Sequence, residues 1–201
     1  MIFASLEFLT FFFPLFLGGY FLAPRAYRNL VLLLASWLFY GWWSPVFLLL
    51  FIGLAFVGWV GGLAVDRVEP QERKLQVVKL MVVLMLAILC WFKYTNIVVE
   101  TLASVAPVLL KPLTGWERIA LPIGLSFTVL QIISYVTDVY RKTTPSEPRF
   151  SNFAMYLAMF GHLVAGPIIR YDWIRKELNE RLTSWANFNA GARRFMVGMS
   201  M

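Results

Sequence analysis

The feature that most constrains this sequence is a run of 37 residues, between Arg28 and Asp66, without a single Asp, Glu, Lys or Arg. As one α-helix at 1.5 Å per residue, the run would be about 55 Å long, nearly twice the hydrocarbon thickness of a bilayer. The run therefore has to turn. Gly41-Trp42-Trp43-Ser44-Pro45 combines helix-breaking residues with tryptophans that favour the membrane interface. We expect a hairpin of two transmembrane helices near 29–42 and 46–65.

The composition of the whole chain is also typical of a membrane protein. Of the 201 residues, 60% are hydrophobic and 14% are charged, against about 25% charged in soluble domains. The single cysteine excludes an internal disulfide. The formal net charge of +7 fits a membrane protein that keeps Lys and Arg in its cytoplasmic loops, so we expect the lipid bilayer, and no nucleic acid, as the partner of this surface.

Further apolar segments predict additional crossings. Residues 2–22 are long enough to span the hydrocarbon, residues 80–91 form a shorter span that flanking lysines extend by snorkelling, and residues 119–137 form another. The charged stretch 66–79 is expected as an extramembrane loop or a short surface helix. The glycines at 53, 58, 61 and 62 predict a close approach of a neighbouring helix.

Two apolar segments are interrupted by proline and glycine. Residues 97–118 contain Pro107, Pro112 and Gly115, so we expect a partial or re-entrant segment followed by a loop. Residues 150–169 contain the pair Gly166-Pro167, which leaves two alternatives, a full crossing and a re-entrant element.

Basic residues are distributed unevenly between the expected loops. Loops on one side hold nine Lys and Arg before residue 150, and loops on the other side hold three. The positive-inside rule then predicts an outside amino terminus. Six more basic residues follow residue 169, and they stay cytoplasmic only if 150–169 re-enters, so the charge pattern favours re-entry. They are Arg170, Arg175, Lys176, Arg181, Arg193 and Arg194.

After residue 170 the pattern becomes amphipathic. Ile174, Leu178, Leu182 and Trp185 recur at spacings of four, four and three, with charged residues between them. This pattern predicts a helix over 171–185 that lies on the membrane surface or against a partner.

Few residues in the apolar segments carry chemistry. His162, the only histidine, is our catalytic candidate, because an intramembrane ionisable group needs a partner or a water-filled cavity; a neutral histidine that hydrogen-bonds across a helix interface is the alternative. Gln131 and Ser134 share a helical face and either line a polar path or bond to a neighbouring helix. Asp138 closes the uncharged run; it is a third residue of that path, a member of a local ion pair or a helix-end anchor. One His and one Cys exclude the usual metal sites, so no metal or bound cofactor is expected.

Ordered motifs carry more information than composition. The string Leu121-Pro122-Ile123-Gly124-Leu125-Ser126-Phe127, then Gln131, Ser134-Tyr135 and Asp138-Val139-Tyr140-Arg141, resembles the hallmark of the membrane-bound O-acyltransferase family, and its alginate O-acetyltransferase branch in particular. The stretch His162 to Pro167 with Arg170 is similar to the next motif of that branch. Earlier landmarks appear in the same order, namely Tyr27-Arg28-Asn29, Ala35-Ser36, Phe39-Tyr40 and Phe92-Lys93-Tyr94.

The resemblance implies an all-α, polytopic enzyme of the bacterial inner membrane with re-entrant and half-helix segments, in which a ring of helices surrounds a thin central layer. It implies transfer of acetyl groups from a cytoplasmic donor, acetyl-CoA, across the membrane for O-acetylation of an exported, alginate-like polysaccharide, with periplasmic or membrane acetylation partner proteins. In this reading His162 matches the earlier of two family histidines, which has either a catalytic supporting role or a structural one, and Gln131, Ser134 and Asp138 are candidates to line the substrate tunnel.

Members of the family are about twice as long, and the histidine usually assigned as catalytic lies in their later half. We therefore expect residues 1–201 to be the N-terminal portion of one membrane domain and to be inactive alone. Two alternatives for the function are a transporter subunit and a non-catalytic scaffold of an export complex. A transporter predicts an internal repeat of broken helices, and none is evident.

Overall fold

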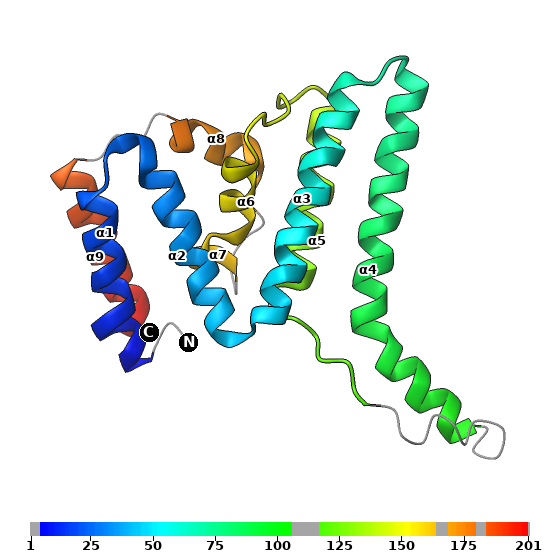
Figure 1. Cartoon of the computed structure of the whole chain (residues 1–201), viewed down its shortest axis with the longest axis horizontal. Coiled ribbons are helices and arrows are strands. Elements are labelled where there is room, and N and C mark those ends of the chain that lie inside the picture. Colours follow the sequence, from blue (N-terminus) through cyan, green and yellow to red (C-terminus); the bar gives the residue numbers. More distant parts are fainter. Residues whose placement is uncertain (1–4, 106–116, 164–168, 180–183, 201) are drawn as a thin grey trace.

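A computed structural model describes residues 5–105, 117–163, 169–179 and 184–200, and these residues contain helices and no strand (Figure 1). The helices form a row, with α1 (Phe13–Leu22) and α9 (Trp185–Ser200) at one edge and α4 (Gln71–Val105) at the other (Figure 1). The prediction of an all-α protein is confirmed. Over the described residues the arrangement is an open row, whereas the family resemblance implied a ring.

The first span is not a plain α-helix. Residues Phe8–Phe12 form a π-helical segment, η1, which leads directly into α1. Pro14 lies at the start of α1, and a proline supplies no N–H to the preceding turn. A π-bulge is one way in which a helix accommodates such a break in its hydrogen-bond ladder.

The central hairpin is confirmed. α2 (Arg28–Trp43) and α3 (Pro45–Arg67) meet at Ser44, whose hydroxyl accepts a hydrogen bond from the backbone N–H of Phe47. Because Ser44 caps α3 and Pro45 occupies its first turn, the second helix starts immediately after the first one ends.

The long helix α4 corrects two expectations. The charged residues 71–79 form its first turns rather than a separate loop or surface helix, and residues 97–105 continue it rather than re-entering the membrane. With 35 residues, α4 is about 52 Å long. Residues 106–116, which contain the interrupting prolines and Gly115, lie outside the described part of the chain.

The next span, α5 (Leu125–Tyr140), begins six residues later than predicted. Gly124 precedes it with a φ of 82°, a backbone conformation that glycine adopts without steric cost. Residues 117–124 are not helical and run back along the bundle to that turn (Figure 1).

The segment after α5 re-enters the bundle. α6 (Phe150–Ala158) and the short α7 (Phe160–Leu163) lead inward, and α8 (Tyr171–Asn179) lies back at the end of the bundle where α6 began (Figure 1). The Tyr156 hydroxyl donates to the carbonyl of Ile169 at 2.7 Å, which ties the returning chain to the inward one. Six consecutive residues of α6, 152–157, are buried. Re-entry, favoured by the charge pattern, is thus confirmed.

Basic connections gather at one end of the bundle. The α1–α2 turn with Arg25, the α3–α4 turn after Arg67, the α5–α6 loop with Arg141 and the whole of α8 lie at the same end (Figure 1). This grouping agrees with the positive-inside pattern of the sequence. The amphipathic helix ends at Asn179 rather than at the predicted residue 185, and Trp185 begins α9; residues 180–183 lie outside the described part.

Close packing at glycine joins α3 to its neighbours. A Cβ atom built on Gly58, Gly61 or Gly62 would lie 2.9, 2.5 or 2.4 Å from a side-chain atom of Ile132, Met81 or Tyr135, respectively. The prediction of close approach holds for these three glycines. It is wrong for Gly53, where a Cβ atom would meet nothing within 4 Å.

Large apolar side chains remain exposed along the row. Within the described residues, α3 and α4 are long and apolar enough to cross a membrane, and only 33% and 17% of their most apolar stretches are buried inside the protein. The segment Phe8–Leu22 and α5 are shorter apolar helices. Exposed Leu15, Leu38, Leu49 and Leu80 belong to a surface suited to lipid.

Candidate functional site

A polar face runs along α5. We call Thr128, Gln131, Ser134, Tyr135 and Asp138 the α5 polar face, since an advance of 100° per residue places all five within about 120° of the helix circumference. Thr128, Gln131 and Tyr135 are completely buried, Asp138 is buried, and Ser134 is half-buried. The structure therefore places Gln131 and Ser134 on one face, as the sequence predicted, with Asp138 on the same face; the tunnel role of the three stays a prediction.

The polar groups in the middle of the α5 polar face have no hydrogen-bond partner among the described residues. Both polar atoms of the Gln131 amide and the hydroxyl of Thr128 are buried without a hydrogen-bond partner among the described residues. A buried, unpaired polar group costs about 1–3 kcal/mol, and native proteins rarely leave one without a water, a ligand or another polar group. These two side chains offer two amide N–H donors, a hydroxyl and a carbonyl oxygen to such a group.

Asp138 lies where the helix ends. Its backbone carbonyl accepts hydrogen bonds from the N–H and the hydroxyl of Thr143, at 3.0 and 2.9 Å. The carboxylate forms no ion pair with another described residue, although Arg141 lies three positions ahead. The anchoring of the helix end thus comes from the main chain of Asp138, and its carboxylate remains a tunnel-lining prediction.

His162 lies on α7, whose position is fixed by α2. The backbone N–H of Phe160 donates to the Ser36 hydroxyl at 3.3 Å, and the Phe160 ring packs edge-on against Phe12 and Phe16. The backbone of His162 is therefore placed inside the re-entrant segment. Its side chain lies outside the described part of the structure, so both alternatives for its role stay predictions.

A second polar cluster, centred on Glu147, was missed in the sequence. Glu147 is only 3% exposed, and its Oε1 atom accepts hydrogen bonds from the Arg149 N–H at 3.0 Å and from Asn152 Nδ2 at 3.2 Å. The Tyr171 hydroxyl donates to its Oε2 atom. A buried carboxylate with three donors is held firmly in place.

The backbone of Glu147 joins the same cluster to the membrane-spanning helices. Its N–H donates to the Tyr135 hydroxyl at 2.9 Å, and its carbonyl accepts from Trp59 Nε1 at 2.8 Å. Glu147 thus ties the α5–α6 loop to α3, α5, α6 and α8 at once. No pattern in the sequence marks it, because a glutamate between two prolines in a polar loop reads as solvated.

Tyr171 is the residue through which α8 joins this cluster. Burial, followed by the hydrogen bond to Glu147, raises the pKa of Tyr171 far above its ordinary value of 10.0. The phenol therefore stays protonated and continues to donate to the carboxylate at every physiological pH. The hydrogen bond from the neutral Tyr171 hydroxyl to the buried Glu147 carboxylate therefore joins α8 to the loop that precedes the re-entrant segment.

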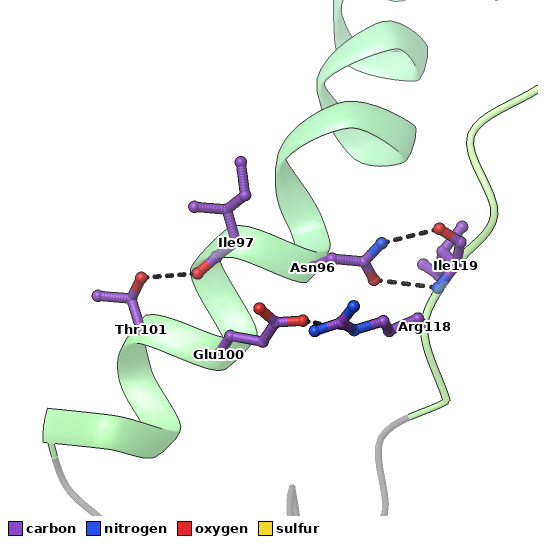
Figure 2. Close-up of polar contacts among 6 residues, drawn as sticks. All are labelled: Asn96, Ile97, Glu100, Thr101, Arg118 and Ile119. Carbon is purple, nitrogen blue, oxygen red and sulfur yellow. Dashed lines mark hydrogen bonds and ion pairs between the residues drawn. The ribbon is translucent and has the colours of Figure 1, made fainter.

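A clamp at the opposite end positions the chain that leads into α5 (Figure 2). The Asn96 side chain donates to the Ile119 carbonyl at 2.8 Å and accepts from the Ile119 N–H at 3.0 Å. The neighbouring ion pair of Arg118 with Glu100, at 2.9 Å, has exposed side chains and contributes little. The two Asn96 hydrogen bonds thus hold the non-helical stretch 117–124 against α4 at Ile119.

Comparison with known proteins identifies relatives over nearly the whole chain. It is 42% identical over 98% of its length to a protein named probable alginate O-acetylase AlgI from Pseudomonas syringae, and 42% identical over 98% to one of the same name from Azotobacter vinelandii. It is 23% identical over 99% of its length to a peptidoglycan O-acetyltransferase from Helicobacter pylori.

The chain spans about two fifths of the length of these relatives, between 38% and 43% of each. No family model matches the chain, and no solved structure matches it.

Proposed function

Because the chain belongs to the membrane-bound O-acyltransferase family, in its alginate O-acetylase branch, we propose that it forms part of an enzyme that O-acetylates an exported polysaccharide. The observation that carries the proposal is 42% identity over 98% of the chain to a protein named alginate O-acetylase. A relative named peptidoglycan O-acetyltransferase supports the same reaction on a different glycan. An alginate-like polymer is the acceptor that we propose.

The proposed reaction moves an acetyl group from a thioester to a hydroxyl. The acceptor oxygen forms a bond to the acetyl carbonyl carbon, the carbon–sulfur bond breaks, and the hydroxyl proton passes by way of a base to the leaving thiolate. We assign the base to His162, since imidazole exchanges protons near neutral pH. The donor is acetyl-CoA from the cytoplasm.

The α5 polar face is the proposed path for the reacting groups. Gln131 has buried polar atoms without a partner among the described residues, and Ser134 and Asp138 share its face. In apolar surroundings such groups bind the carbonyl or hydroxyl of a passing substrate. Support comes from the burial and the unmet hydrogen-bonding capacity of the face.

The proposed location is the bacterial inner membrane, with the amino terminus in the periplasm. The gathering of basic connections at one end of the bundle supports this orientation, since that end is then cytoplasmic. Periplasmic or membrane acetylation proteins are the proposed partners that receive the acetyl group or present the polysaccharide.

The burial of two α8 residues favours the enzyme over the scaffold alternative. That alternative has the amphipathic segment 171–185 recruit a soluble partner. Tyr171 and Leu178 are 1% and 6% exposed, because they pack on the protein's own core. The Leu178 carbonyl also accepts from Asn29 Nδ2 at 3.1 Å. α8 is therefore a fixed part of the bundle.

The proposal is tested by the acetyl-ester content of the exported polysaccharide. Cells that lack the gene are complemented with the protein as its gene encodes it, with a His162→Ala variant or with a Cys90→Ala control. Cys90 is exposed on α4, away from the α5 polar face. We expect the histidine variant to reach normal membrane levels and to lose ester content, and the control to retain it. Normal ester content with His162→Ala would refute the assigned role.

A further inference from the structure

A cavity with two arginines opens at the basic end of the first helix. Its volume is about 470 Å³, and it lies between the end of α1, the turn that leads into α2 and the start of α9. The residues that line it are Phe21, Arg25, Arg28, Ser184, Trp185 and Phe188. Among these described residues two are cationic and none carries a negative charge. The described part of the lining therefore favours an anion.

Local contacts hold the arginine side of the cavity in place. The Arg28 guanidinium lies over the Tyr20 ring, 5.4 Å from its centroid, and its Nε donates to the Ala23 carbonyl at 3.4 Å. On the opposite wall the Ser184 hydroxyl accepts from the Asn187 N–H at 3.1 Å and caps α9. The first turn of a 16-residue helix adds backbone N–H groups and a positive dipole end.

Two apolar cavities adjoin this charged one, and each shares an aromatic wall with it. One, of about 410 Å³, shares Phe21 and extends between α1, α2 and α8 toward Met159. The other, of about 400 Å³, shares Phe188 and extends along α1 and α9 toward Phe195. Phe21 and Phe188 face each other edge-on at 5.7 Å. The cavity with the two arginines thus borders two separate apolar cavities.

We propose that this three-part cavity binds an anionic two-chain phospholipid. The phosphate lies against Arg25 and Arg28, and one acyl chain occupies each apolar cavity. A soluble phosphate compound fits the charged part but leaves both apolar cavities without an occupant, so charge and shape together select a lipid. The proposal does not depend on acetyl transfer.

The position in the membrane agrees with this occupant. Trp185 is 76% exposed beside the cavity, and tryptophan favours the level of lipid headgroups. The cavity lies at the same end as the basic connections, the end proposed to face the anionic cytoplasmic leaflet. A bound lipid would fill the space between α1 and α9, which contact each other through stacked Phe13 and Phe195 at 5.1 Å.

The test measures lipid affinity by native mass spectrometry on the protein as its gene encodes it, purified in detergent. Dioleoylphosphatidylglycerol and dioleoylphosphatidylcholine are titrated in parallel, and inorganic phosphate is added as a competitor. We expect tighter binding of the anionic lipid, and no displacement of it by millimolar phosphate. The double variant R25Q/R28Q should lower affinity for phosphatidylglycerol about 30-fold, at about 1 kcal/mol for each arginine, and change phosphatidylcholine binding little.

A matched variant separates the cavity from general charge. R193Q/R194Q removes two exposed arginines of α9 that do not line these cavities, and it should leave the affinity nearly unchanged. Gly191→Leu places a side chain in the cavity between α1 and α9, where a Cβ atom meets nothing within 4 Å, and should weaken lipid binding with both arginines present. Equal affinities for the two lipids, equal losses in the two double variants, or displacement by phosphate would overturn the proposal.

Discussion

Gly62 is the position where one added methyl group should disturb the bundle most. A Cβ atom there would lie 2.4 Å from Cε1, 2.7 Å from the hydroxyl oxygen and 2.8 Å from Cζ of Tyr135. The ring cannot easily yield, because it packs against Phe153 at 4.5 Å and Tyr171 at 5.2 Å. Its hydroxyl also accepts from the backbone of Glu147.

The magnitude follows from three contributions. Overpacking a tight core costs about 1–3 kcal/mol, and a displaced Tyr135 would leave the buried Glu147 N–H unpaired at a cost of about 1–3 kcal/mol. Alanine gains about 0.5–1 kcal/mol over glycine in a helix. We expect Gly62→Ala to destabilise the protein by about 1–5 kcal/mol.

Two other glycines of α3 give matched controls. Gly53→Ala meets open space and should stabilise the protein by about 0.5–1 kcal/mol. Gly61→Ala meets the flexible end of Met81 at 2.5 Å, so its effect should lie between the other two. The assay is an SDS unfolding titration of each variant, as its gene encodes it, in mixed micelles. A Gly62→Ala variant as stable as Gly53→Ala would refute the packing described for α3 and α5.

Four further predictions concern the polar clusters and the clamp. Gln131→Leu removes unpaired buried groups and should raise stability by about 1–3 kcal/mol while acetylation falls, as a stability titration and ester analysis would show; a loss of stability would mean that the amide has a structural partner. Glu147→Gln should cost about 2 kcal/mol and speed hydrogen exchange in α8, which would stay slow if Tyr171 did not depend on the carboxylate. Because the folded pKa of Tyr171 is raised, stability is complete below pH 10 and decreases as the pH rises above it; Tyr171→Phe should remove that part of the decline, and an unchanged alkaline profile would contradict the burial of the phenol. Asn96→Leu should lower stability by about 1–2 kcal/mol and increase protease cleavage near Ile119, with Glu100→Gln, an exposed ion-pair partner, as the nearly neutral control.

The apolar pattern predicted the hairpin, and the charge pattern favoured the re-entrant segment. The charge-free run longer than one bilayer had only one solution, and α2 and α3 follow it closely. For 150–169, the basic residues after it favoured re-entry, because a crossing would have placed them on the opposite side from the other basic loops. In the structure, the hydrogen bond from Tyr156 to Ile169 holds the returning chain against α6.

The starts of α4 and α5 were harder to predict. Charges over 71–79 suggested a separate surface segment, yet residues such as Gln, Glu, Arg and Lys are good helix formers and simply extend α4 beyond its apolar part. Pro122 and Gly124 fall near the start of the predicted span 119–137, but only the positive φ at Gly124 shows that the helix starts after them.

The α5 polar face was only partly predictable. Helical spacing placed Gln131 and Ser134 on one side, and burial confirms this for Gln131. Glu147 and Tyr171 were not found because they are 24 residues apart and meet only after the chain has entered and left the bundle. Such a pair depends on tertiary topology and leaves no local signal.

The main proposal is that this protein takes part in acetyl transfer to an exported glycan. The most direct measurement uses membrane vesicles from cells that produce the polysaccharide and the protein as its gene encodes it. Acetyl-CoA labelled in the acetyl group is supplied on the cytoplasmic face, and hydroxylamine-labile label in the polysaccharide is counted. The account predicts label that requires the wild-type gene and is lost with His162→Ala. Equal label in vesicles that lack the protein would contradict it.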